Sequence, residues 1–275
     1  MSIVFIGGGN MASALIGGLL AHGQAATDIR VVEINPDAAQ RLRSTWGVAT
    51  HLEAGPALRD AGTLVLAVKP QHMAAVTQAL PPLPADMRVI SIAAGVRTAL
   101  LSRWLQGHAN IVRAMPNTPA LIQQGVAGLY AMPGVSQEDR LHAQSLMRAV
   151  GSVVWVSREA DLDAVTAVSG SGPAYVFLVM EAMMKAARSL GLDEATARTL
   201  VLDTVQGAAM LAKAGPDAPD ELRRKVTSPG GTTEAAVAVL HAQGLEQLFS
   251  QAMHAAAARS AELGDGLAHE AGEIN

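Results

Sequence analysis

The sequence contains no cysteine and few aromatic residues. The first feature limits the chemistry that the chain can perform, and the second limits the composition of its core. Without cysteine, a chain of 275 residues has no disulfides, no thiolate nucleophile and no cysteine-ligated metal site. It has only three Phe, two Tyr and three Trp, although 50% of its residues are hydrophobic. The core must therefore consist of Ala, Val, Leu, Ile and Met, a composition that suits closely packed helices and a parallel sheet. The length allows two domains with a sizeable core.

A strong excess of charge is also lacking. The formal net charge is −4 with dispersed Lys and Arg, so we expect neither a nucleic-acid groove nor a membrane-binding surface. The longest apolar run, residues 174–187, contains Glu181 and Lys185 and is expected to be too short to span a bilayer. The N-terminus shows no signal-peptide pattern, and the eight histidines share no metal-binding motif. We therefore expect a cytoplasmic protein without a metal site.

The most specific local pattern lies in the first twenty residues. Residues 2–6 predict a short buried strand, the segment GGGNMA follows at once, and an amphipathic helix then begins. In this G-x-G-x-x-A pattern, Gly7 allows the turn out of the strand, Gly9 lets the backbone approach a pyrophosphate, and Ala12 lets helix and strand pack closely. The N–H groups at the helix start point at the anion. An ordinary glycine-rich turn is the alternative, and the position between strand and helix argues against it.

Apolar strands alternate with helical segments through the first half of the chain, which is typical of a parallel sheet covered by helices. The expected strands are residues 2–6, 29–33, 63–68, 88–92, 110–114, 126–130 and 152–156, and two of the helices are residues 36–44 and 137–150. Ligands bind where such strands end. Three of these ends carry unusual residues, namely VKP (68–70), AAG (93–95) and RAMPNTP (113–119).

An acidic residue, Glu33, closes the second expected strand. An acid at this position typically accepts a hydrogen bond from the adenosine ribose 2′-hydroxyl and repels a 2′-phosphate, which favours NAD. Alternatively, Glu33 is a solvated charge while Asn35 or Arg30 contacts a phosphate. The uncertain register of the preceding loop, residues 20–29, leaves both interpretations open.

Beyond about residue 157 the pattern changes to helices rich in Ala, Leu and Met, with no convincing strand. The expected helices are residues 162–168, 174–190, 193–214, 219–226, 233–243 and 245–263. Residues 174–190 and 193–214 are apolar on more than one face, as in helices that are buried from several sides. We therefore predict a homodimer in which these helices interlock, the alternative being that both pack only on the first domain. Residues 264–275 are expected to form a loose tail.

Two segments interrupt the helical pattern, SGSGPAY (169–175) and TSPGGTT (227–233). Each leads into a helix and offers hydroxyl groups, glycines and helix-start N–H groups, so each is a candidate anion site. Simple capping turns are the alternative. Two such loops in a chain with a nucleotide-binding domain favour a cradle for a substrate carboxylate.

Six segments together resemble pyrroline-5-carboxylate reductase, the family that completes proline biosynthesis. They are FIGGGNMA (5–12), AVKP (67–70), SIAAGV (91–96), RAMPNTPA (113–120), SGSGPAYVF (169–177) and TSPGGTT (227–233), and they occur in the family's order and spacing. The resemblance implies an α/β chain with a Rossmann-like parallel-sheet domain, residues 1–157, and an all-α dimerisation and substrate-binding domain, residues 158–275. It also implies homodimers that assemble further in some members, and NADPH more often than NADH.

The resemblance further assigns residues to the reduction of 1-pyrroline-5-carboxylate to L-proline by hydride transfer from NAD(P)H. The substrate would be held by Ser228, Gly230, Gly231, Thr232 and Thr233, and the catalytic group would be the Thr233 hydroxyl at the imine nitrogen. The cofactor would be bound by Gly7, Gly9, Asn10, Met11, Ala12, Glu33, Val68, Lys69, Pro70, Ala94 and Asn117. Lys69 either steadies charge or ribose or, alternatively, donates a proton. Glu33 replaces the smaller residue of many members, which leaves the choice between NADP and NAD open.

Other functions are weighed against this one. A β-hydroxyacid dehydrogenase would share the overall plan, but that family carries an Asn and a Lys on its first long interdomain helix. Here the first lysine of that helix is Lys185, roughly three turns along. A reductase of a related cyclic imine stays open, because the carboxylate loop does not report ring size. A non-catalytic NADPH-sensing dimer is the remaining alternative, although a sensor has no need of the hydroxyls and glycines in residues 228–233.

Overall fold

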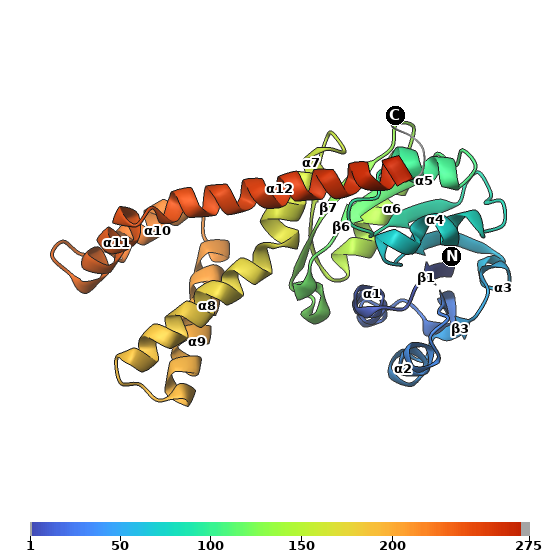
Figure 1. The fold of residues 1–275 in the computed structure, drawn as a ribbon. Coiled ribbons are helices and arrows are strands. Elements are labelled where there is room, and N and C mark those ends of the chain that lie inside the picture. Colours follow the sequence, from blue (N-terminus) through green and yellow to red (C-terminus); the bar gives the residue numbers. More distant parts are fainter. Residues whose placement is uncertain (1, 271–275) are drawn as a thin grey trace. The chain divides into compact units, whose positions relative to one another are not determined.

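The computed structural model describes residues 2–270, which form two compact units (Figure 1). One unit contains residues up to Ser171 together with the chain from Ala255 onward, and the other contains Gly172–His254. The last helix, α12 (Leu245–Glu270), therefore contributes to both units. Residues 158–171 group with the sheet by their contacts, so the functional boundary expected after residue 157 stays a prediction.

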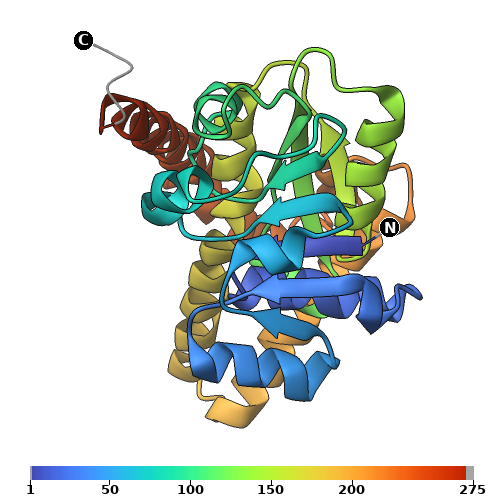
Figure 2. The same ribbon diagram turned by 90° about the vertical axis from the view of Figure 1, so that its right-hand side faces the viewer.

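The first unit is built on an eight-stranded sheet in the order β3-β2-β1-β4-β5-β6-β7-β8 (Figure 2). The strands are β1 (Ser2–Ile6), β2 (Ile29–Val32), β3 (Ala49–His51), β4 (Ala61–Leu66), β5 (Arg88–Ser91), β6 (Ile111–Met115), β7 (Gly125–Ala131) and β8 (Gly151–Trp155). The predicted parallel sheet is confirmed for β1 to β6, whereas β7 is antiparallel to β6. The connection between these two strands, residues 116–124, is shorter than the dozen or so residues that a parallel crossover needs.

Helices and helical turns cover both faces of this sheet, because successive strand residues point to opposite sides. They are α1 (Asn10–Ala21), η1 (Ala26–Asp28), α2 (Pro36–Trp46), α3 (Ala54–Leu58), α4 (Pro70–Gln78), α5 (Thr98–Trp104), η2 (Thr118–Ile122), α6 (Gln137–Arg148), α7 (Asp161–Val165) and the π-helical turn η3 (Thr166–Gly170). Ile3 and Phe5 pack in one core with α1, α2 and α6. Val4 and Ile6 pack in a second core with α3, α4 and α5. The central strands are thus buried on both faces, as their apolar residues predict, whereas the edge strands β3 and β8 contain no buried residue.

A polar cluster lies where β4 and β5 begin. The hydroxyl of the fully buried Thr63 lies 2.9 Å from Nε2 of His142, and Nε of Arg88 donates to Oδ1 of Asp139 at 2.5 Å. Burial, and then the charge of Arg88, lower the pKa of His142 below its ordinary value of 6.5, while Asp139 opposes this shift. His142 is therefore held neutral in the folded protein near neutral pH.

We expect stability to depend on pH through His142. Because its pKa is lower in the folded than in the unfolded chain, the unfolded chain binds a proton first as the pH falls below about 6.5, and the free energy of unfolding decreases there. His142→Gln should flatten this dependence in urea unfolding at a series of pH values. His72→Gln, at an exposed position, is the control and should keep the wild-type slope. Equal slopes for wild type and His142→Gln would contradict the prediction.

The second unit is entirely helical, as the sequence predicts. It contains α8 (Gly172–Ser189), α9 (Glu194–Ala214), α10 (Pro219–Lys225), α11 (Thr232–Ala242) and the first part of α12. Asp193 caps α9 by accepting a hydrogen bond from the Thr196 N–H at 2.9 Å. Large apolar side chains stay exposed on α8 and α9, among them Phe177 at 62%, Leu178 at 66% and Met210 at 61%. A single chain therefore leaves these helices partly uncovered.

The interruption predicted at residues 169–175 is shorter than expected, because η3 continues α7 to Gly170 and α8 begins at Gly172, with only a bend at Ser171 between them. The π-helical turn extends the helix to Gly170, and the N–H of Ser171, its C-cap residue, donates to the Thr166 carbonyl at 2.8 Å. By length and composition alone, the 29-residue helix could cross a membrane, although the core helix of a soluble protein passes the same test. The prediction that the apolar run is too short to span a bilayer considered only residues 174–187, whereas the helical residues 161–189 together are long enough.

The loose tail predicted at residues 264–275 is wrong for the part that the structure describes, because α12 continues through it, and the remainder lies outside the described residues. Gly264 packs closely on the turn after β5: a Cβ at Gly264 would lie 2.9 Å from the Gly95 carbonyl oxygen. Asp265 accepts a hydrogen bond from Nη2 of Arg97 at 3.1 Å. Small and charged residues thus dock this part of the helix, so its polarity in the sequence was misleading.

Candidate active site

The carboxyl ends of neighbouring strands bring the predicted cofactor residues to one edge of the sheet. Ile6 pairs with Val32 of β2 and with Leu66 of β4. The glycine loop follows the first of these strands, Glu33 follows the second, and residues 68–70 follow the third. This edge is where open parallel sheets bind their ligands.

The glycine loop leaves space for a phosphate group. Gly7 has φ of +97°, which glycine adopts readily, and its N–H donates to the Val32 carbonyl at 2.9 Å. A Cβ at Gly7 would lie 2.9 Å from the Ala67 oxygen and 3.0 Å from Cγ1 of Val68. A Cβ at Gly9, in contrast, would meet nothing within 4 Å, and no side chain caps α1, which follows Gly9. The open space and the uncapped helix start fit a dinucleotide pyrophosphate.

The other residues predicted beside this loop differ in exposure. Asn10 and Lys69 are exposed, Met11 and Pro70 are half-buried, and Ala12 is packed into the core. Lys69 stands directly before α4, and Pro70 is the first residue of that helix, a position that favours proline. The structure therefore places these side chains around one edge, while their contacts with a cofactor stay a prediction.

Ala94 and Asn117 follow β5 and β6 and differ in their surroundings. Ala94 is exposed in its turn, whereas Asn117 is only 8% exposed. The Asn117 amide donates to the Ser169 carbonyl at 3.1 Å and accepts from the Val126 N–H at 2.9 Å. Because both ends of its amide are used inside the unit, Asn117 holds these segments together, and its role as a cofactor ligand stays a prediction.

Glu33 links the glycine loop to the turn after β2, which neither interpretation of the sequence included. Its Oε2 accepts from the Gly8 N–H at 2.8 Å, and its Oε1 accepts from the Asn35 N–H at 2.7 Å. Arg30 lies at the other end of these strands, where its Nη2 is 3.4 Å from the Ser2 hydroxyl. The alternative that Arg30 contacts a phosphate beside Glu33 is therefore wrong.

The structure also contains a buried charged cluster, formed by Arg113, Glu159 and Thr98, that the sequence analysis did not predict. Arg113 of β6 is 1% exposed, and its Nη1 donates to Oε1 of Glu159 at 3.1 Å. The Thr98 N–H and hydroxyl donate to the two oxygens of Glu159 at 2.7 and 2.8 Å. The cluster thus ties β6 to the start of α5, just after the turn that contains Ala94. The RAMPNTP segment marked the strand end but gave no signal for the distant glutamate.

In the second unit, residues 227–233 form the turn that opens α11 and contain all five predicted substrate residues. Gly230 has φ of +71°, and its N–H donates to Oε2 of Glu234 at 2.7 Å. The Gly231 N–H donates to the Ser228 carbonyl at 3.0 Å. Gly231 is the N-cap residue, and no side chain caps the helix start. The first-turn N–H groups can therefore bind an anion such as a carboxylate.

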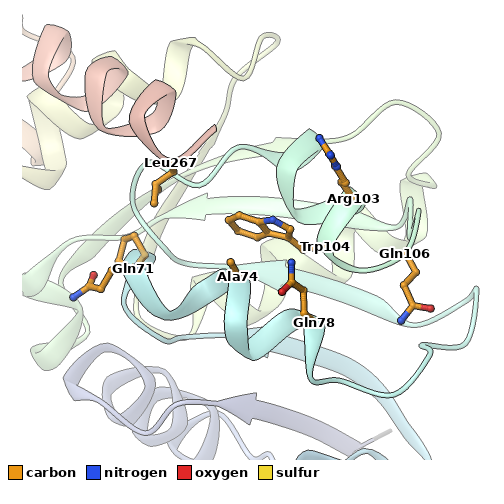
Figure 3. A pocket seen from close by; sticks show the side chains of 8 residues that line it. Gln71, Ala74, Gln78, Arg103, Trp104, Gln106 and Leu267 are labelled. Carbon is orange, nitrogen blue, oxygen red and sulfur yellow. The ribbon is translucent and has the colours of Figure 1, made fainter. Parts of the chain in front are cut away.

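A cavity of about 600 Å³ lies elsewhere in the first unit, between α4, α5 and Leu267 (Figure 3). It is lined by Pro70, Gln71, Ala74, Gln78, Arg103, Trp104, Gln106 and Leu267. Only Pro70 is also a predicted cofactor residue, so this cavity does not coincide with the candidate site. Among the residues that the structure describes, no group of three or more His, Asp or Glu side chains is arranged to hold a metal ion.

Two known families match separate parts of the chain. Residues 159–263 match the family described as pyrroline-5-carboxylate reductase dimerisation. Residues 2–95 match the family described as NADP oxidoreductase coenzyme F420-dependent. Pyrroline-5-carboxylate reductase of Pseudomonas aeruginosa is 48% identical over 96% of this chain and 97% of its own length. That of Pasteurella multocida is 46% identical over 95% of this chain and 97% of its own length.

Solved structures agree with these relatives. A pyrroline-5-carboxylate reductase from Coxiella burnetii matches with a TM-score of 0.90 and 44% identity, over 95% of this chain and 98% of that one. The Plasmodium falciparum pyrroline carboxylate reductase with NADP bound matches with a TM-score of 0.84 and 27% identity, over 96% of this chain and 98% of that one. The similarity thus extends over both units.

Proposed function

The chain belongs to the pyrroline-5-carboxylate reductase family, whose members reduce 1-pyrroline-5-carboxylate to L-proline with NAD(P)H, and we propose which of its residues carry that reaction. The main support for this activity is that reductases of this name are 48% and 46% identical to the chain over 96% and 95% of its length. This reaction is the final step of proline biosynthesis. NADP(H) is the cofactor that the relationships favour, and NAD(H) is used in the family as well.

The cofactor lies, in this proposal, along the edge formed by the ends of β1, β2 and β4. The uncapped start of α1 after Gly9 holds the pyrophosphate, and Gly7 keeps the loop against Val68. The ligand set is completed by Asn10, Met11, Ala12, Glu33, Lys69, Pro70, Ala94 and Asn117. Bound NAD(P)H supplies the hydride, so the chain itself needs only to position the two reactants and steady the imine. Lys69, exposed at this edge, steadies charge rather than shuttling a proton.

The substrate carboxylate binds at the start of α11. The uncapped N–H groups after Gly231 face an anion there, and Ser228 adds a hydroxyl to the same turn, with Gly230, Thr232 and Thr233 completing the cradle. The Thr233 hydroxyl then hydrogen-bonds the imine nitrogen while its charge and proton redistribute. Because the charge on the imine nitrogen changes during hydride transfer, a hydrogen bond to this nitrogen can stabilise the transition state more than the bound substrate, which raises the rate.

The test is turnover of 1-pyrroline-5-carboxylate by Thr233→Ala. We expect a rate about 10- to 150-fold lower, because a hydrogen bond to a charged group contributes roughly 1.5–3 kcal/mol. The KM for NADPH should stay within about twofold, since Thr233 lies in the substrate turn and not at the glycine loop. Thr233→Ser keeps the hydroxyl and should recover most of the rate. If wild-type protein consumes neither NADPH nor NADH with this substrate, a related cyclic imine or a sensor role replaces the proposal.

The assembly proposed is a homodimer formed through the helical region, which matches a dimerisation family. Exposed apolar side chains on α8 and α9 support this, since a second copy would remove them from water. We further propose that dimers associate into larger assemblies, that the protein acts in the cytoplasm, and that the apolar helix of residues 161–189 faces protein and not a membrane. We propose a small molecule as the substrate and no nucleic-acid partner for the protein.

A further inference from the structure

The last part of α12 packs closely on the turn that follows β5. Gly264 is buried, and a Cβ at this position would lie 2.9 Å from the Gly95 carbonyl oxygen. Gly95 is buried as well and has φ of +76°, and a Cβ there would lie 3.6 Å from the Gly264 nitrogen. Three residues after Gly264, Leu267 packs on the core that contains α4 and α5. The backbones of the helix and the turn are therefore in contact, with no room for a side chain between them.

Polar contacts hold the same helix and turn together. Nη2 of Arg97, two residues after Gly95, lies 3.1 Å from Oδ1 of Asp265 and 3.8 Å from Oδ2 of Asp163. Oδ1 of Asp163 accepts a hydrogen bond from the Ser260 hydroxyl at 2.7 Å, and Ser260 is only 6% exposed. Because Asp163 belongs to α7 and the other two partners belong to α12, these contacts tie the turn to both helices.

The other end of the turn is fixed where α5 begins. The Thr98 N–H and hydroxyl donate to the two oxygens of Glu159 at 2.7 and 2.8 Å, and Glu159 also accepts a hydrogen bond from the buried Arg113 of β6. Ala94 is exposed in the same turn, at the edge where the parallel strands end. Its position therefore depends on α12 from one side and on Glu159 from the other.

This turn lies on the half of the sheet that would hold the nicotinamide. In the strand order β3-β2-β1-β4-β5-β6, a dinucleotide crosses the sheet edge between β1 and β4. The end of β2, where Glu33 stands, is the place of the adenosine ribose, so β4 and β5 belong to the nicotinamide half. A displacement of Ala94 would therefore move the nicotinamide and leave the adenosine half in place.

We propose that the last part of α12 positions the turn after β5 for the nicotinamide, which makes Gly264, Asp265 and Ser260 positioning residues for the reduction. The inference rests on the proposed cofactor site and adds the element that holds one half of it. The helix acts through the turn and not by contact with a reactant. Because hydride transfer requires a close and aligned approach, a displacement of about 1 Å can lower the rate by up to about 100-fold.

Gly264→Ala and Gly266→Ala form a matched pair that tests this on the full chain. Both replace a glycine of α12 and raise its helix propensity alike, but a Cβ at Gly266 would meet no atom of the described residues within 4 Å. With 1-pyrroline-5-carboxylate and NADPH, kcat should fall about 10-fold or more in Gly264→Ala and stay within about twofold in Gly266→Ala. The dissociation constant of 2′,5′-ADP, which contains only the adenosine half, should change less than about twofold in both variants.

A second set of variants removes the charged contact without adding a group. Asp265→Ala should lower kcat about threefold or more, because Arg97 loses its partner on α12. Asp265→Asn keeps an oxygen that can accept from Arg97 and should recover most of the rate. Glu262→Ala removes the same charge from an exposed ion pair with Arg259 on the same helix, and its kcat should match that of wild type.

The combination of readouts separates positioning from a purely structural role. A lower kcat in Gly264→Ala and Asp265→Ala, with unchanged affinity and stoichiometry for 2′,5′-ADP, supports the proposal. Wild-type kcat in both variants overturns it, and so does a loss of kcat that is matched by an equal loss of 2′,5′-ADP sites, because that result means unfolding. If wild-type protein binds neither NADPH nor 2′,5′-ADP, the proposed cofactor site itself is wrong, and this inference with it.

Discussion

Glu159→Ala will lower the free energy of unfolding of the sheet-containing unit by about 3–5 kcal/mol, the usual cost of leaving a buried charge without its partner. Arg113 is only 1% exposed, and Glu159 is the residue that receives its hydrogen bond. Nε and Nη2 of Arg113 have no partner among the described residues, so the guanidinium has no second contact to fall back on. Thr98 would lose its acceptors at the start of α5 in the same step.

Urea unfolding followed by circular dichroism measures this loss, and two further variants test its cause. Glu138→Ala removes an 84%-exposed partner of Arg88 and should cost about 1 kcal/mol or less, as exposed ion pairs do. The double variant Arg113→Met with Glu159→Leu removes both charges and should be more stable than Glu159→Ala alone, because no unpaired charge is then buried. A cost below about 1 kcal/mol for Glu159→Ala would show that water or rearrangement replaces the carboxylate.

The strand-and-helix order of the first unit could be predicted because local patterns determine it. Buried parallel strands are largely continuous apolar runs, as in residues 3–6 of β1 and residues 64–66 of β4. β3 was missed because it has three residues, Ala49–His51, of which two are polar and none is buried. The direction of β7 depends on how short its connection to β6 is, which a strand's own residues do not record.

The edge of the sheet that gathers the site was likewise predictable, since parallel strands end together. The contacts within it were not. The hydrogen bond from the Gly8 N–H to Glu33 joins residues 25 positions apart in the chain, and the pair of Arg113 and Glu159 is 46 positions apart. Such pairs follow from register and packing, because no periodic pattern connects them. The docking of α12 through Gly264 is of the same kind, since a glycine in a polar segment is typical of a tail and also of a close contact.

We expect Phe177→Asp to dissociate the proposed homodimer. Phe177 is 62% exposed within one chain, so it contributes little to the packing of its own helical unit, and it lies in the region that matches the dimerisation family. Placing a carboxylate in an apolar interface without a partner costs several kcal/mol. Since about 1.4 kcal/mol corresponds to a tenfold change in affinity, the dimer dissociation constant should rise by a factor of about 100 or more.

Sedimentation equilibrium over a dilution series measures that constant, and Leu141→Asp provides the matched control. Leu141 is a 53%-exposed apolar residue on α6, outside residues 159–263, so the same substitution there should leave the dimer intact. Circular dichroism should show native helix content in both variants, because neither side chain is buried within its own chain. A Phe177→Asp protein that keeps the wild-type mass at every dilution would mean that this face of α8 is covered by something other than a second copy.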